Sequence, residues 1–140
     1  MNQAFKNINE IPVLTWSWLH VNDVDLKRDF PSVLPYQRNP VQEVLPDGVK
    51  VTPYEKTGAF LHEQLPAIKA KKELLDYMAE NRNSGYVIRI PEGRKADKPI
   101  FLSYVLDEKN PVLTDDIVIL AEKGSKATVI IQLPWRCTGL

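Results

Sequence analysis

The sequence has little cysteine, little histidine and no excess of charge of either sign. It holds one cysteine, Cys137, and two histidines, His20 and His62, among 140 residues. One thiol cannot form an internal disulfide, and these ligands are too few for a Cys/His zinc site. Lysine plus arginine and aspartate plus glutamate both number 18. Such a balance is unlike the strongly basic surface of a nucleic-acid-binding protein.

Long apolar runs are also missing. The longest ones fall well short of a membrane span, and the opening MNQAFKNINEIPV lacks the basic end and apolar stretch of a secretory signal. Hydrophobic residues make up 44% of the chain and charged residues 26%, which is typical of a globular domain. We therefore expect a cytoplasmic protein with neither a membrane nor a nucleic acid as partner.

Recognisable catalytic motifs are absent too. The polar segment Pro91–Lys98 (PEGRKADK) has one glycine, Gly93, and an apolar run follows it. A phosphate-binding loop needs several glycines and a following helix, so we interpret this segment as a corner between two strands. The histidines and serines match no metal or nucleophile motif. Asp115 and Asp116 are adjacent, so on a strand they would face opposite ways, and we interpret them as the charged end of a loop. We expect no enzyme, and we assign no catalytic, cofactor-binding or metal-binding residue.

Proline is abundant before residue 84 and predicts an irregular and helical region over residues 1–84. Within it, Trp16 and Trp18 are expected to dock this N-terminal arm on another surface. Residues 41–53 alternate around Pro46-Asp47-Gly48 and predict a small hairpin. The apolar spacing in Leu65–Asn81 predicts the one clear helix, with Leu75 and Met78 buried.

Short β-branched segments dominate residues 85–140, which we assign to a β-strand region. We expect strands at Tyr86–Ile90, Pro99–Leu106, Ile117–Glu122 and Ala127–Leu133, with a tight turn at Glu122–Ser125. In the first strand, the side chains of Tyr86, Ile88 and Ile90 should share one face. No helix-length segment separates the strands, so helical crossovers are not expected. A sandwich of hairpins and a solenoid with corners both fit this pattern.

The order of motifs resembles the SufB/SufD family of iron–sulfur cluster assembly scaffolds. A strand ends in Ile90-Pro91 and Gly93, a second strand opens with Pro99-Ile100 and Leu102, and the run IVILAEKGSKAT (Ile117–Thr128) follows. Upstream, TWSWLHVND (Thr15–Asp23) is similar to the entry segment of that family, and LPDGVKV (Leu45–Val51) to its hairpin. The similar segments occur in the family's order over most of the chain.

This resemblance implies a helical and irregular N-terminal region that leads into a right-handed parallel β-helix. It also implies a non-catalytic scaffold of the SUF system that works with an ABC-type ATPase and a SufB/SufD-type paralogue. Members of the family have a much longer β-helix, so we interpret the chain as an expressed fragment or a natural truncation. The cluster and ATPase sites belong to the later portion of these proteins, so the resemblance assigns no site residue, Cys137 included. The iron–sulfur cluster is expected only in the full-length assembly.

An early end of the solenoid would leave apolar strand surface uncovered. We expect this edge to form a homodimer through the C-terminal strands, with Val129 and Ile131 on the contact face and Trp135 nearby. The competing possibility is that the arm covers the edge through Trp16 and Trp18. A second functional interpretation remains open: a stand-alone β-sandwich binding module that uses Trp16, Trp18 and Trp135 as its ligand platform. A third interpretation, which the sequence supports less, is an enzyme that binds a phosphorylated ligand.

Overall fold

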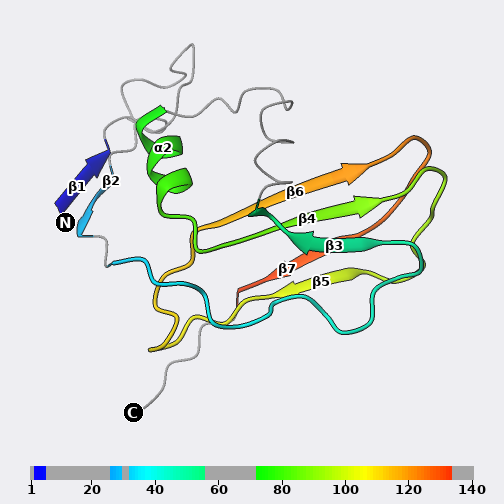
Figure 1. Cartoon of the computed structure of the whole chain (residues 1–140), viewed down its shortest axis with the longest axis horizontal. Coiled ribbons are helices and arrows are strands. Elements are labelled where there is room, and N and C mark those ends of the chain that lie inside the picture. The colour runs from blue at the N-terminus through cyan, green and yellow to red at the C-terminus, as the bar shows by residue number, and fades with distance from the viewer. Residues whose placement is uncertain (1, 6–25, 30–31, 56–71, 134–140) are drawn as a thin grey trace, which may run out of the picture.

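The computed structural model describes residues 2–5, 26–29, 32–55 and 72–133 (Figure 1). These residues form a mixed α+β structure with mostly strands, one short helix and three small sheets. In chain order the elements are β1 (Asn2–Phe5), β2 (Leu26–Asp29), β3 (Lys50–Pro53), α2 (Lys72–Glu80), β4 (Ser84–Ile90), β5 (Ile100–Ser103), β6 (Asp115–Ala121) and β7 (Val129–Gln132).

The sheets combine antiparallel and parallel pairs. Strands β1 and β2 pair antiparallel as a separate two-stranded sheet. The second sheet has the order β3-β4-β6, in which β3 is antiparallel to β4 and β4 is parallel to β6. The third sheet pairs β5 with β7 in parallel. Each parallel pair therefore joins strands that are two apart in the chain, and from β4 onward consecutive strands alternate between the second and third sheets.

Two successive passes of the chain lie side by side in register. We call residues 84–103 the first coil and residues 115–132 the second coil. Ser84 pairs with Asp115 and Ile90 with Ala121, and the isolated bridge between Lys95 and Lys126 keeps the same spacing. That spacing is 31 residues, as it is for the hydrogen bond between Asn83 and Thr114. It is two residues shorter between β5 and β7.

The corners of the two coils also lie against each other. In Figure 1 the two connections leave β4 and β6 at the same end of the sheet and run together to β5 and β7. The amide of Gly93 donates to the carbonyl of Lys123 at 2.9 Å, and the amide of Lys126 donates to the carbonyl of Arg94 at 2.8 Å. Gly93 and Gly124 have positive φ angles of 68° and 69°, which glycine adopts without steric cost. The expected corner at Pro91–Lys98 and the expected turn at Glu122–Ser125 are both confirmed.

The main core lies between the second and third sheets. Its buried members come from β4, from β5 and the residue after it, and from the residue before β3: Val49, Ile88, Ile90, Ile100, Leu102 and Tyr104. Full burial of one such aliphatic side chain contributes about 1.5–3 kcal/mol. A second cluster on the opposite face of β4 and β6 holds Tyr54, Val87 and Val118. The strand over 86–90 thus alternates as predicted, and both of its faces contribute buried residues, although Arg89 is exposed.

The predicted hairpin over residues 41–53 is wrong, although its turn is correct. The amide of Val49 donates to the carbonyl of Pro46 at 3.1 Å, and Gly48 has a φ of 79°. Beyond that turn the two arms separate: β3 pairs with β4, whereas Val41 bridges to Leu102 of β5. The alternating pattern reflects an extended segment that pairs with two other strands, because backbone groups can be satisfied by any adjacent edge.

The predicted helix is confirmed over Lys72–Glu80, and the part before Lys72 lies outside the described residues. The prediction that Met78 is buried is wrong, because its side chain is 41% exposed. Leu75 is only half-buried, and α2 has no buried residue. The helix lies beside the start of β4, at the end away from the corners (Figure 1). Neither buried cluster includes a residue of α2.

The expected strands exist, and the structure pairs β6 with β4 and β7 with β5 in two separate sheets. Their bounds differ by a few residues, most of all for β5, which ends at Ser103 rather than Leu106. Because both pairs are parallel, consecutive strands do not form the hairpins of the sandwich alternative. Asp115 and Asp116 are the first residues of β6 rather than the end of a loop.

Candidate interaction edge

The outer edge of the first coil is covered by residues 40–53, which we call the cap segment. Strand β3 pairs with β4 over its whole length. Along β5, the amide of Ser103 donates to the carbonyl of Pro40 at 2.8 Å, and the amide of Phe101 donates to the Gln42 side chain at 3.0 Å. Figure 1 shows this segment running beside β5, turning near the corners and returning as β3. The cap segment therefore satisfies the free edges of both sheets at this end.

The second coil has a free edge in both sheets within the residues that the structure describes. There β6 is the last strand of the sheet β3-β4-β6, and β7 pairs only with β5. Such an edge presents unpaired N–H and C=O groups and can add a further strand. We call the unpaired edge of β6 (Asp115–Ala121) and β7 (Val129–Gln132), together with Leu133, the open edge.

Aliphatic side chains are exposed at the open edge because the second coil repeats the inward-facing positions of the first. Ile88 is fully buried, and its partner Ile119 is 47% exposed. Leu102 is fully buried, and its partner Ile131 is 49% exposed. Immediately after these strands, Tyr104 is fully buried and Leu133 is 58% exposed. The exposed surface is therefore a cross-section of the hydrophobic core.

The open edge contains two of the five residues predicted as an interaction surface. Ile131 is on the exposed part, whereas Val129 is half-buried and packs against the main core. Trp16, Trp18 and Trp135 lie outside the described residues. The prediction did not include Ile119 and Leu133. The signal for Ile119 was an internal repeat, which does not extend to Leu133: YVIRIPEGRKA (Tyr86–Ala96) and IVILAEKGSKA (Ile117–Ala127) share valine, isoleucine, glycine, lysine and alanine at equal spacing.

A shallow hollow of about 500 Å³ lies where the open edge meets the corner. It is lined by part of β6 together with Arg89 and Glu122. The Arg89 guanidinium donates to the Glu122 carboxylate at 2.6 Å, and the other carboxylate oxygen accepts from the amide of Glu92 at 3.1 Å. These bonds lower the pKa of Glu122 below its usual range, with the Arg89 bond as the largest cause. Glu122 thus ties the second coil to the first at the corner.

A buried polar contact lies at the other end of the strands. The Tyr104 hydroxyl donates to Asp115 Oδ2 at 2.7 Å. Burial is the largest cause that raises the pKa of Asp115, and the Tyr104 bond opposes it. Burial also raises the pKa of Tyr104 far above its ordinary value. Asp115 and Asp116 diverge as predicted, since Asp116 pairs with Arg82 at 3.7 Å.

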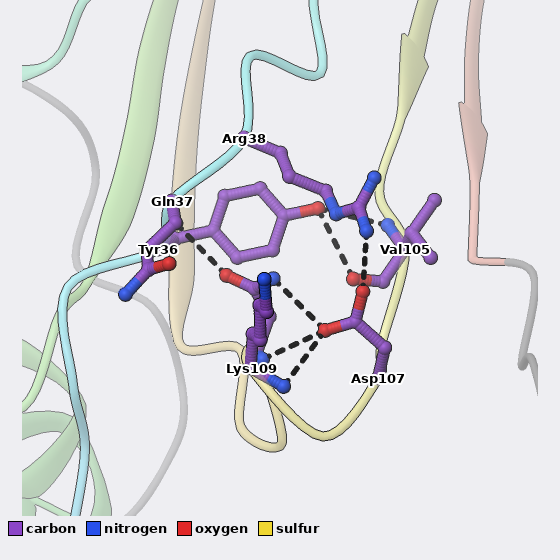
Figure 2. Close-up of polar contacts among 7 residues, drawn as sticks. Tyr36, Gln37, Arg38, Val105, Asp107 and Lys109 are labelled. Carbon is purple, nitrogen blue, oxygen red and sulfur yellow. Dashed lines mark hydrogen bonds and ion pairs between the residues drawn. The ribbon is translucent and has the colours of Figure 1, made fainter. Parts of the chain in front are cut away.

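A polar network holds the loop between β5 and β6 against the start of the cap segment (Figure 2). Asp107 accepts hydrogen bonds from the amides of Lys109 and Asn110 and from the Asn110 side chain, at 2.9–3.0 Å. It also pairs with Arg38 at 2.5 Å. Asn110, which is buried, accepts from the amide of Gln37 at 2.8 Å. These hydrogen bonds and the ion pair hold the loop in place.

Neither a metal site nor a membrane helix is found in the described part of the chain. No group of three or more His, Cys, Asp or Glu side chains is positioned to hold a metal ion there. Among the same residues, no helix has the length and apolar character needed to cross a bilayer. Comparison with family models, curated proteins and solved structures gives no significant match.

Proposed function

We propose that this chain is a non-catalytic scaffold segment of the iron–sulfur cluster assembly system, similar to the SufB/SufD family. In the full-length protein it would work with an ABC-type ATPase subunit and a SufB/SufD-type paralogue. Its β-strand region would be the start of a right-handed parallel β-helix. The observation that carries this proposal is the in-register stacking of the first and second coils, at a spacing of 31 residues through β4, β6 and the corners and two residues less between β5 and β7.

The motifs behind the resemblance support the proposal through their positions. Pro91 and Gly93 lie in the corner of the first coil, and Glu122 and Gly124 lie in the corner of the second. Solenoid corners require residues that turn the chain in a fixed place on every pass. Each motif is short, but their positions in the two corners explain why the same residue types recur.

The polar clusters of the described residues support a scaffold role as well. Asp107, Asn110 and Glu122 each bind backbone amides that hold loops or corners in place. Such carboxylate and amide groups stabilise the fold through hydrogen bonds that need no substrate. This is what a framework for other proteins needs.

The test is affinity purification of the complete product of the reading frame, tagged in its source cells, with the bound proteins identified by mass spectrometry. We expect an ABC-type ATPase subunit and a second SufB/SufD-type protein to be enriched over a tag-only control. A core variant, Ile88→Asp, should lose both, because a charge placed at a fully buried position disrupts the first coil. A well-folded product that brings down no such ATPase would contradict the proposal.

A further inference from the structure

We propose that the start of the second coil is a pH-dependent latch: a proton on the Asp115 carboxyl keeps it closed against the first coil, and loss of this proton opens it. The latch consists of Ser84 at the start of β4, Tyr104 just after β5 and Asp115 at the start of β6. It lies at the end of the strands away from the corners (Figure 1). This inference is independent of iron–sulfur chemistry and of what binds the open edge.

The latch joins both sheets of the coil pair through buried polar atoms. Ser84 and Asp115 are the first register pair of β4 and β6, and Tyr104 is fully buried. The Tyr104 hydroxyl donates to Asp115 Oδ2 at 2.7 Å. Asp115 Oδ1 and Ser84 Oγ are also buried, and neither forms a well-formed hydrogen bond with a described residue. A proton on Oδ1 lets the carboxyl donate to Ser84 while Oδ2 still accepts from Tyr104.

The ionised form of Asp115 faces no cation among the described residues. The groups around it are hydroxyls and one carboxylate: Ser84 and Tyr86 on β4, Tyr104 after β5, and Asp116 on β6. Behind Tyr104 lies Tyr36, with its ring centroid 5.6 Å from that of Tyr104. Burial is the largest cause that raises the pKa of Asp115; contacts with Tyr104 and Ser84 oppose it, and the charge of Asp116 adds to it. Because a buried carboxylate without a counter-ion is costly, ionisation favours a conformation in which water reaches it.

Asp116 provides the contrast at the neighbouring position. It pairs with Arg82 at 3.7 Å, and it also contacts Tyr54. The Arg82 guanidinium lies 4.0 Å from the centroid of the Tyr54 ring. Both aspartates thus contact a tyrosine, but only Asp116 has a cation beside it that balances the ionised form. Asp116 is therefore the matched control for Asp115.

The corner of the second coil responds to pH in the opposite sense. Glu122 binds Arg89 and the amide of Glu92 as a carboxylate, and these bonds lower its pKa. Its contribution is present above the unfolded pKa and is lost as pH falls through the folded pKa. The contribution of Asp115, whose pKa is raised, is present below the unfolded pKa and is lost as pH rises through the folded pKa. Above the folded pKa of Asp115, the second coil is attached at its corner and released at its start.

The first experiment measures amide hydrogen exchange by NMR across pH, with each rate corrected for the intrinsic pH dependence of exchange. Amides at the start of β6 should lose protection as pH rises through the Asp115 pKa, by up to about tenfold for each unit of the pKa rise. Asp115→Asn cannot ionise and should show constant protection. Asp116→Asn should keep the loss and shift it to slightly lower pH, because the Asp116 charge raises the pKa of Asp115. Constant protection in the wild type would overturn the proposal, as would an unchanged pH dependence in Asp115→Asn.

A second measurement needs no variant and covers the case in which Asp115→Asn fails to fold. A carboxyl NMR titration of the wild type gives the pKa of Asp115, which should lie above its ordinary value of 3.8 and coincide with the midpoint of the exchange change. A midpoint that follows the titration of another group would refute the latch. The amides of Gly93 and Lys126, which bind across the corners, should stay protected over the same pH range. Their simultaneous loss of protection would show general unfolding and would equally contradict the proposal.

Discussion

Gly93 and Gly124 lie against each other in the two consecutive corners, in the same left-handed backbone conformation. A Cβ added at Gly124 would lie 3.8 Å from the Cα of Gly93, in ordinary van der Waals contact. The two glycines are needed for their backbone conformation, since no steric crowding forces a missing side chain. The same left-handed position recurs in both corners, which lie in register.

The two corner glycines give the first prediction. Gly93→Ala and Gly124→Ala should each lower the free energy of unfolding by roughly 1–2 kcal/mol, the cost of a left-handed conformation for a residue with a Cβ. Asn tolerates this conformation better, so Gly93→Asn should lose less. Urea denaturation measures the difference. If alanine and asparagine were both as stable as glycine, the corner would not adopt the described conformation.

Asp115 gives a prediction about pH. Its pKa is raised in the folded chain, so its contribution to stability is present below the unfolded pKa and is lost as pH rises through the folded pKa. Asp115→Asn keeps an oxygen that can accept from Tyr104 and removes the buried charge. The variant should therefore be more stable than the wild type at neutral pH, and the gain should vanish in acid.

The measurement is chemical denaturation of both proteins between acidic and neutral pH, with Asp116→Asn as the neighbouring control. A variant that is less stable than the wild type at pH 7 would show that the carboxylate is stabilised by groups beyond Tyr104.

Asp107 should behave in the opposite way. Its pKa is lowered from an ordinary value of 3.8 to about 2, first by the Asn110 side chain and then by Arg38. Its contribution is thus present above the unfolded pKa and is lost as pH falls toward 2. Asn110→Ala should raise the Asp107 pKa more than Arg38→Ala does. A carboxyl NMR titration reports both values, and the reverse order would mean that the ion pair dominates the network in Figure 2.

The 140-residue chain alone should bind no iron–sulfur cluster. Common clusters take about four protein ligands, mostly cysteine thiolates, and the sequence holds only Cys137. Anaerobic reconstitution with iron and sulfide should leave the protein colourless after desalting. A stable visible chromophore at one cluster per chain would contradict this, and its loss in Cys137→Ser would identify a shared site between copies.

The sequence was sufficient to place the strands but not to pair all of them. Ile88 and Ile90 alternate with residues that prefer the other face, so the strand and its core side follow from periodicity. The corner at Gly93 follows from turn chemistry. The strand that pairs with Val49–Pro53 could not be derived from the sequence, because an extended segment with a nearby turn fits a local hairpin as well as the edge of a distant strand. The structure places it against β4.

The interaction edge was predictable in part. Ile131 was expected on a contact face, and it is exposed there. Ile119 was not singled out, because an apolar run such as IVILA indicates a strand covered on both faces. Only the position of β6 as the last strand of its sheet shows that one side of this residue is uncovered. The prediction for Met78 failed for a different reason. An apolar stripe shows which side of a helix faces the protein, but it does not show how closely neighbouring segments pack against each residue on that side.

The account depends most directly on the register between the two coils. It predicts methyl–methyl nuclear Overhauser effects between Ile88 and Ile119 and between Leu102 and Ile131, because in-register neighbours on adjacent strands lie about 4.8 Å apart. Methyl-labelled protein at low concentration, where a dimer would not contribute, is the sample for this measurement. Both contacts present, with Ile119 and Ile131 accessible to a soluble paramagnetic probe, is the expected result. Cross-strand contacts between β4 and β5 in place of these would show a hairpin and would contradict the stacked coils.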